Sequence, residues 1–247
     1  MLTLPRSHNI VGRWCPSAGA TGFRLIDRSG RYNHMTLNNM DPSTDWVVSG
    51  GKVGIDLDGV DDYARTTNQF NFATLTNYHL SCWIYPRSLS GTKGFIGSDA
   101  NSVGIEFRTN GSQLNFLRQG AFNIAQNAGT VTINTWQLVA INYNSVTGDW
   151  ETFINGKSAA SGTATTTGWG LARLELSAFT ISDPFNGLID DIVLYRNRLT
   201  SSETLEVYKL GRGFGIYPQL DFDEVNKPAG FKAYWANRRS RIIGAGI

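Results

Sequence analysis

The stretch from Phe185 to Tyr208 restricts the possible folds of this chain most strongly, because it reads as one strand that leads directly into one short helix. Its first half has the period of two that places neighbouring side chains on opposite faces of a sheet. We expect one face to carry Asp190, Ile192 and Leu194 and the other to carry Ile189, Asp191, Val193 and Tyr195. A carboxylate at the start of an otherwise apolar row requires a polar partner.

The second half of the stretch carries the signals for a helix. Thr200 stands three residues before Glu203, a spacing that lets the two side chains accept hydrogen bonds from N–H groups at the start of a helix. Gly211 stands where a left-handed C-terminal cap is expected. The sequence therefore predicts one short helix near 201–209, and no other segment favours a helix as clearly.

The rest of the chain consists of short apolar segments separated by turn residues about every 8–12 positions. Asn110-Gly111 suits the two-residue turn of a hairpin over 103–119. Asp58-Gly59 predicts a second hairpin over 52–67, and the segment 135–162 predicts a meander of three strands. This spacing indicates antiparallel sheets in a sandwich or barrel rather than alternating strands and helices.

Composition agrees with a sheet protein that has many tight turns, since glycine is 27 of 247 residues and charged residues are only 17%. A single all-β domain commonly reaches this length. The net charge of +2 is too small to indicate binding of nucleic acid. Cys15 and Cys82 form no metal or redox motif, so we expect free, buried thiols, with a single disulfide as the alternative. No apolar segment is long enough for a signal peptide or a membrane span.

Several stretches in sequence order resemble the signature strands of one superfamily. They are GRW (12–14), IDRSGRYNHMTL (26–37), IDLDGVDDY (55–63), YHLSCWIYP (78–86), TWQLVAINYN (135–144), GDWETFINGK (148–157) and FNGLIDDIVLYRNRLTSSETLEVY (185–208). Together they resemble the laminin-G-like, concanavalin A-like lectin/glucanase jelly-roll superfamily over about residues 11–210. The resemblance implies an all-β, antiparallel β-sandwich in which the N- and C-terminal strands lie near each other. We expect the sandwich to occupy residues 1–211 and a C-terminal arm to occupy 212–247.

Some members of this superfamily hydrolyse glycans, which requires two carboxylates that face the same groove. Asp56 and Asp58 have a suitable spacing, but Asp58 is needed for its turn. Asp61-Asp62 and Asp190-Asp191 are adjacent, so in a strand their side chains point to opposite faces. There is no GxSxG motif, and the three histidines lie in unrelated segments. The sequence therefore predicts a protein that is not an enzyme.

The resemblance also implies that a structural calcium ion could be bound, although no cofactor is required. Calcium prefers carboxylate and carbonyl oxygens, and the candidate ligands are Asp27 and Asp190. These residues lie in two segments that the fold would bring together. The alternative is that Asp27 caps its own turn and Asp190 accepts backbone N–H bonds, with no metal. Arg31 stands where the family often has Asn or Gly, and its cation could replace the metal.

The tail from 212 to 247 combines aromatic and basic side chains, and no acidic residue follows Glu224. We expect it to form an assembly arm that docks on its own sandwich or on a neighbouring subunit. The residues predicted to make this contact are Phe231, Tyr234, Trp235, Arg238, Arg239 and Arg241. Such a pattern can also bind nucleic acid, but one short tail on a nearly neutral chain makes this a minor alternative.

Two functional classes agree with these observations. The first is a non-catalytic bacteriophage virion surface component, such as a capsid decoration, head-fibre or tail-tip protein, that binds other virion proteins or copies of itself. An adhesive fold without an export signal suits a virion, which is assembled in the host cytoplasm and released by lysis. The alternative is a carbohydrate-binding module, extracellular by a non-classical route. It would stack a cell-surface glycan on Trp136, Trp150 or Trp169, although most of these are expected in the core.

Overall fold

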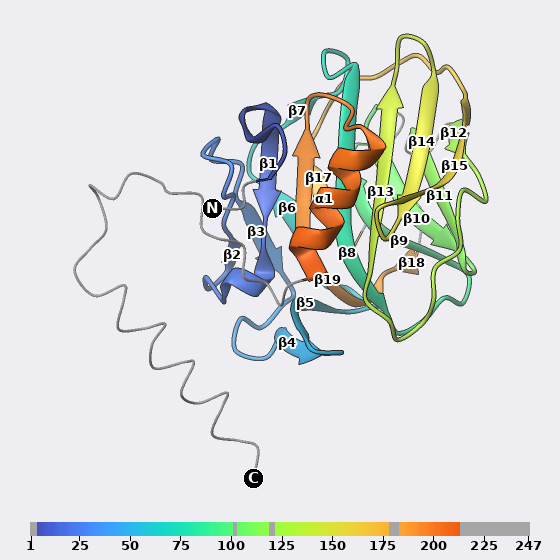
Figure 1. Ribbon diagram of the computed structural model, residues 1–247. Helices are drawn as coiled ribbons and strands as arrows, with labels where there is room; N and C mark the ends of the chain where they lie inside the picture. Colours follow the sequence, from blue (N-terminus) through green and yellow to red (C-terminus); the bar gives the residue numbers. More distant parts are fainter. Residues whose placement is uncertain (1–3, 101–102, 119–121, 178–182, 213–247) are drawn as a thin grey trace. The chain divides into compact units, whose positions relative to one another are not determined.

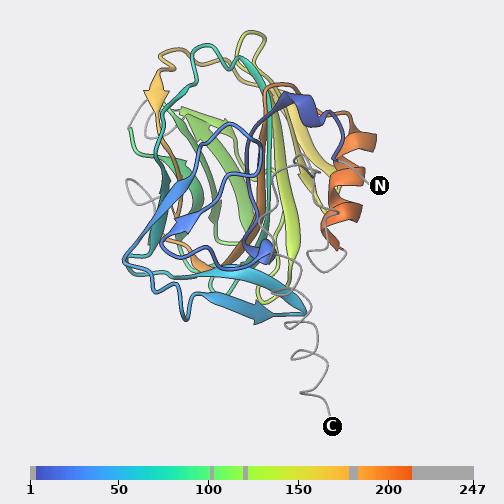
Figure 2. The same ribbon diagram turned by 90° about the vertical axis from the view of Figure 1, so that its left-hand side faces the viewer.

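Two large antiparallel sheets pack face to face in the computed structural model, as Figure 1 and Figure 2 show. The structure describes residues 4–100, 103–118, 122–177 and 183–212. The predicted all-β, antiparallel sandwich is confirmed. The predicted arm from residue 213 onward lies outside the described residues.

The first sheet has eight strands and contains the organising strand β19 near its middle. Its order is β15 (Lys157–Thr163), β14 (Asp149–Ile154), β13 (Gln137–Asn144), β8 (Asn77–Pro86), β19 (Asn186–Tyr195), β5 (Lys52–Asp58) and β4 (Trp46–Ser49). Strand β1 (Ile10–Trp14) pairs with β19 beyond the point where β5 ends, so the N- and C-terminal strands are neighbours. This confirms the arrangement that the family resemblance implies.

The second sheet has nine strands. Its order is β12 (Phe122–Ala125), β11 (Gln113–Arg118), β10 (Ile105–Asn110), β9 (Thr92–Ser98), β17 (Leu174–Leu176), β6 (Tyr63–Thr66), β3 (Met35–Asn38) and β2 (Arg24–Leu25), with β18 (Asp183–Pro184) parallel to β9. A separate small pair joins β7 (Phe70–Asn71) to β16 (Leu171–Ala172). Two single 3-10 turns, η1 (Ser7–Asn9) and η2 (Pro16–Ala18), flank β1.

The main core fills the space between the sheets. Leu80 and Ile141 enter it from the first sheet, and Phe95 and Phe107 enter it from the second, with ring centroids 4.8 Å apart. Burying each such side chain stabilises the fold by roughly 1.5–3 kcal/mol. Both cysteines are buried and free, as the sequence predicts.

Helix α1 (Ser201–Arg212) lies against the outer face of the first sheet, as Figure 2 shows. Val207 and Tyr208 cover Trp83, whose ring stacks on Tyr208 at 5.5 Å, and form a second apolar cluster there. The predicted start is confirmed, because Thr200 N–H donates to Glu203 Oε2 at 2.7 Å and Glu203 N–H donates to Thr200 Oγ1 at 3.2 Å. The predicted end is wrong, since the helix continues through Gly211 to Arg212.

The hairpin predicted over 103–119 and the meander over 135–162 are confirmed. The hairpin predicted over 52–67 is wrong. Strand β5 pairs with β4 and β19 in the first sheet, whereas β6 pairs with β3 and β17 in the second. Gly59 has a φ of 79°, so the turn is as tight as expected, but it carries the chain from one sheet to the other.

The strict alternation predicted for β19 is also wrong, because the strand contains a bulge. Its pairing with β8 shifts register between Asp190 and Val193, and Asp191 has a φ of 47°. Ile189 therefore faces the main core together with Ile192, while Val193 faces the outer cluster. A bulge adds one residue to one strand and so changes the face of every residue on one side of it.

Candidate functional site

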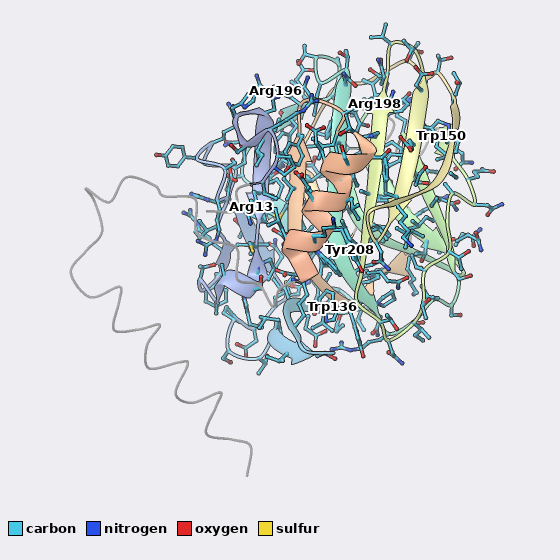
Figure 3. The ribbon with its side chains drawn as sticks, viewed as in Figure 1. Arg13, Trp136, Trp150, Arg196, Arg198 and Tyr208 are labelled. Carbon is cyan, nitrogen blue, oxygen red and sulfur yellow. The ribbon has the colours of Figure 1, made fainter. Side chains whose placement is uncertain are left out.

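An open pocket of about 380 Å³ lies at the end of the sandwich where β1 and β8 begin and β19 ends. We call it the rim pocket. It is lined by Val11, Phe70, Asn71, Thr74, Leu75, Thr76, Asn77 and Arg196. Figure 3 labels Arg196 at this end of the molecule.

Three local features of the chain build the rim pocket. The pairing of β1 with β19 shifts register between Ile10 and Gly12, which places Val11 in a bulge. Asn71 ends β7 and turns the chain, since its Oδ1 accepts the N–H of Ala73 at 3.1 Å. Asn77 then starts β8. The pocket is therefore held by the paired ends of strands rather than by a single loop.

The walls of the rim pocket combine an apolar ring with amide and hydroxyl groups. Phe70 is 6% exposed and is fixed by an edge contact with Trp14, with ring centroids 6.4 Å apart. Asn77 Oδ1 is buried and makes no hydrogen bond within the part of the chain that the structure describes. Thr76 lies beside it. An apolar surface next to a few polar groups is the usual chemistry of a site for a small polar ligand with an apolar face.

The turn that carries Arg196 is fixed by Asn142 on β13. Asn142 Nδ2 donates to the carbonyl of Leu199 at 2.7 Å, and the N–H of Leu199 donates to Asn142 Oδ1 at 3.1 Å. The same Oδ1 lies 2.9 Å from His79 Nδ1, which must carry the proton of that contact because Oδ1 only accepts. Burial lowers the pKa of His79 to about 4, so the imidazole is neutral. Sequence reasoning missed Asn142, because nothing in its neighbourhood indicates a contact 57 residues away.

The bulge in β19 brings Asp190 and Asp191 into one buried charge network, contrary to the opposite faces that the sequence predicts. Asp190 forms an ion pair with Lys52 and accepts the N–H of Ser17 at 2.8 Å, and Asp191 lies 3.4 Å from Arg13 Nε. Burial acts to lower the pKa of Lys52, but the two carboxylates together raise it above its usual value. Both acids are buried and each lies beside a cation, which indicates a structural role.

Asp27 and Asp190, the predicted calcium ligands, do not fit a calcium site as they are placed. Asp27 Oδ1 accepts the N–H groups of Arg13 and Ser29, at 3.0 and 2.8 Å, and its Oδ2 accepts the N–H of Asn33 at 2.9 Å. Asp190 is neutralised by Lys52 rather than by Arg31, whose Nε donates to the carbonyl of Ile10. Calcium binding remains a prediction.

Asp58, Asp61 and Asp62 form another acidic group, in the turn between β5 and β6. Their carboxylate oxygens lie within 4.8 Å of one another, close enough to hold one ion. Burial raises the pKa of Asp62 to about 6, and the neighbouring aspartates add to this. The sequence prediction missed the group because adjacent residues point to opposite faces only within a strand.

A further pair of acids, Glu106 and Glu175, lies on the outer face of the second sheet. Glu175 pairs across the sheet with Gly97, and Glu106 lies on the other side of Gly97 because Phe107 pairs with Ile96. Both glutamates are buried, and each lies beside an arginine, Arg108 for Glu106 and Arg65 for Glu175. Ion-paired carboxylates excluded from water do not form the open acid and base pair that glycan hydrolysis requires.

The three tryptophans predicted to stack on glycans do not form one surface. Trp150 and Trp169 pack against the main core, whereas Trp136 contacts the outer cluster and donates to the carbonyl of Ser49 at 2.6 Å. Figure 3 shows Trp136 and Trp150 at opposite ends of the first sheet. Stacking on any one of them remains a prediction. The six arm residues, Phe231, Tyr234, Trp235, Arg238, Arg239 and Arg241, lie outside the described residues.

Comparison with protein families finds a match. A model described as the concanavalin A-like lectin/glucanases superfamily matches residues 58–204. The comparison with curated proteins found no match. Within the described part of the chain, no helix combines the length and the apolar character that crossing a membrane requires.

Three solved structures show the same fold at low sequence identity. Domain 4 of AbnA, a GH43 extracellular arabinanase from Geobacillus stearothermophilus in complex with arabinotriose, is 17% identical with a TM-score of 0.63, covering 81% of this chain and 98% of that one. Trypanosoma rangeli sialidase in complex with sialic acid is 15% identical with a TM-score of 0.62, over 87% of this chain and 35% of the sialidase. The botulinum neurotoxin type G receptor binding domain is 17% identical with a TM-score of 0.61, over 82% and 51%. The chain thus spans about a third of the sialidase and half of the toxin domain.

Proposed function

Because the chain belongs to the concanavalin A-like lectin/glucanase superfamily, we propose that it is a non-catalytic adhesive protein that binds carbohydrate in the rim pocket. The rim pocket is the observation that carries this proposal, since Phe70 and Leu75 offer apolar surface beside the polar groups of Thr76 and Asn77. Sugars have apolar ring faces and hydroxyl edges, and such a site matches both. The solved structure with arabinotriose shares the fold over nearly its whole length, which supports the same class of ligand.

The burial of the acids on β10, β17 and β19 supports binding rather than hydrolysis, and the exposed pair Asp58 and Asp61 lies in the turn after β5, outside the lining of the rim pocket. Asp190, Asp191, Glu106 and Glu175 are all buried, and each lies beside a cation. A general acid or base must reach the substrate within hydrogen-bond distance. This arrangement supports binding without turnover.

A glycan array followed by calorimetry tests the proposal. Thr76→Val keeps the shape of the side chain and removes its hydroxyl, and Asn77→Ala removes the amide. Each should weaken binding of the strongest array ligand about 3- to 10-fold, the value of a neutral hydrogen bond. Thr36→Val is the matched control, because Thr36 is an exposed threonine on β3 in the other sheet. Full binding by both rim variants would exclude the rim pocket as the binding site.

The finer proposal is that this adhesive protein is a bacteriophage virion surface component attached through its C-terminal arm. What supports it is the sequence after Glu224, which has five cations, three large aromatic residues and no acid. Deleting residues 227–247 should abolish stoichiometric copurification with particles and leave glycan binding unchanged. If the arm-deleted protein still copurifies with particles, attachment through the arm is excluded. If its oligomer size is unchanged, subunit contact through the arm is excluded.

A further inference from the structure

The rim pocket has an unbalanced charge. Arg196 is the one charged residue of its lining, and the pocket contains no acidic side chain. The backbone N–H of Arg196 donates to the carbonyl of Asn9 at 2.9 Å, so the start of the arginine side chain is fixed beside η1. The residue is exposed. Arg196 therefore contributes a cation with a fixed backbone and an exposed side chain to the lining of the pocket, and Figure 3 labels this residue.

This arginine differs from the six described arginines that form an ion pair. The side chains that pair with a carboxylate are Arg6, Arg13, Arg65, Arg87, Arg108 and Arg173. Arg196 makes no such ion pair within the described residues. Arg31, whose Nε binds the carbonyl of Ile10 next to Val11, also has no carboxylate partner there. The positive charge near the pocket is thus left uncompensated by the described chain.

We propose that the rim pocket takes a sugar that carries a carboxylate, with Arg196 as its counterion; this rests on the carbohydrate binding proposed above. A guanidinium presents two parallel N–H donors, which match the two oxygens of a carboxylate. The sugar ring would lie against Phe70 and Leu75, and its hydroxyl groups would reach Thr76 and Asn77. Arg31 adds long-range attraction that salt weakens.

An array of acidic and neutral glycans tests the proposal. Calorimetry then compares the strongest acidic ligand with its methyl ester, in which only the negative charge is removed. Arg196→Gln should weaken binding of the acidic ligand by about 10- to 100-fold, the value of a charge-assisted hydrogen bond, and leave binding of the ester unchanged. Arg24→Gln is the matched control, because Arg24 is an exposed arginine on the other sheet that makes no carboxylate ion pair with the described residues. Wild-type affinity for the acidic ligand should also fall as salt rises.

The outcomes separate this inference from the function on which it rests. Acidic array ligands that are lost in Arg196→Gln and kept in Arg24→Gln support it. If neutral ligands bind best, or if acidic ligands bind Arg196→Gln as well as they bind the wild type, the charge preference is overturned. The proposed carbohydrate binding still stands in that case. If the wild-type protein binds no glycan on the array, both proposals fail.

Discussion

Replacing Asn142 by alanine tests how the turn that carries Arg196 is held in place. The amide of Asn142 satisfies both the N–H and the carbonyl of Leu199 and accepts the Nδ1 proton of His79. His79 and Asn142 are at most 1% exposed, and Leu199 is 3% exposed, so water does not reach these groups in the folded protein. Asn142→Ala leaves three buried polar groups without their partner.

The magnitude follows from those three groups. Each buried polar group left unpaired costs about 1–3 kcal/mol, and a water that enters the new space recovers part of this. We therefore expect Asn142→Ala to lower the free energy of unfolding by about 3–5 kcal/mol, which for a chain of this length lowers Tm by roughly 10 °C. The turn should also move, so glycan affinity at the rim pocket should fall with it.

Urea denaturation followed by tryptophan fluorescence measures the loss of stability, and hydrogen exchange at the amide of Leu199 reports the local opening. Asn38→Ala is the control, because Asn38 makes one exposed hydrogen bond, to the carbonyl of Thr36 at 3.1 Å, and its loss should cost less than about 0.5 kcal/mol. A loss below about 1 kcal/mol in Asn142→Ala, with unchanged exchange at Leu199, would refute the reasoning that this amide holds the turn.

Four other predictions concern charge. Because burial lowers the pKa of His79 to about 4, the unfolded chain binds a proton below pH 6.5 that the folded chain excludes. The free energy of unfolding should therefore fall by about 2–3 kcal/mol from pH 7.5 to 4.5 through this residue, and a pH slope no steeper than that of His79→Gln would contradict it. Lys52→Met leaves Asp190 buried without its cation and should lower the free energy of unfolding by about 3–5 kcal/mol. Adding Asp190→Asn should recover most of this loss. A loss too small to measure would show that the pair is not charged. Because the pKa of Asp62 is raised, the contribution of this one residue to the free energy of unfolding is highest below pH 4 and falls as pH rises to 6, by about 1 kcal/mol after screening in an open turn. Asp62→Asn should remove this part of the pH dependence. If calcium binds this turn, millimolar Ca²⁺ should raise the Tm of the wild type but not of Asp61→Asn, and an unchanged wild-type Tm would contradict calcium binding.

Local sequence was sufficient wherever the deciding interactions are between near neighbours. Thr200 and Glu203 predicted the start of α1 because both partners of the capping bonds lie within one turn. Asn110-Gly111 predicted a hairpin because its turn geometry is a property of those two residues. The sandwich itself followed from such segments together with the family resemblance.

Local sequence was not sufficient where a distant partner decides the outcome. Asp58-Gly59 correctly indicated a tight turn, but which strand lies beside β5 depends on Asn186 and its neighbours, more than a hundred residues away. The candidate site shows the same limit, since Arg196 stood in the sequence as one of many arginines.

The sequence by itself determined the strand and helix segments, their turns and the chemical character of each face, because these depend on residues a few positions apart. Only the tertiary structure decided which sheet each strand joins and that a bulge turns Asp190 and Asp191 into one buried network. It also decided that Arg196 has no acidic partner among the described residues at the rim pocket. The physical reason is that ion pairing, burial and pocket shape depend on contacts between segments far apart in the chain, which periodicity and turn signals do not encode.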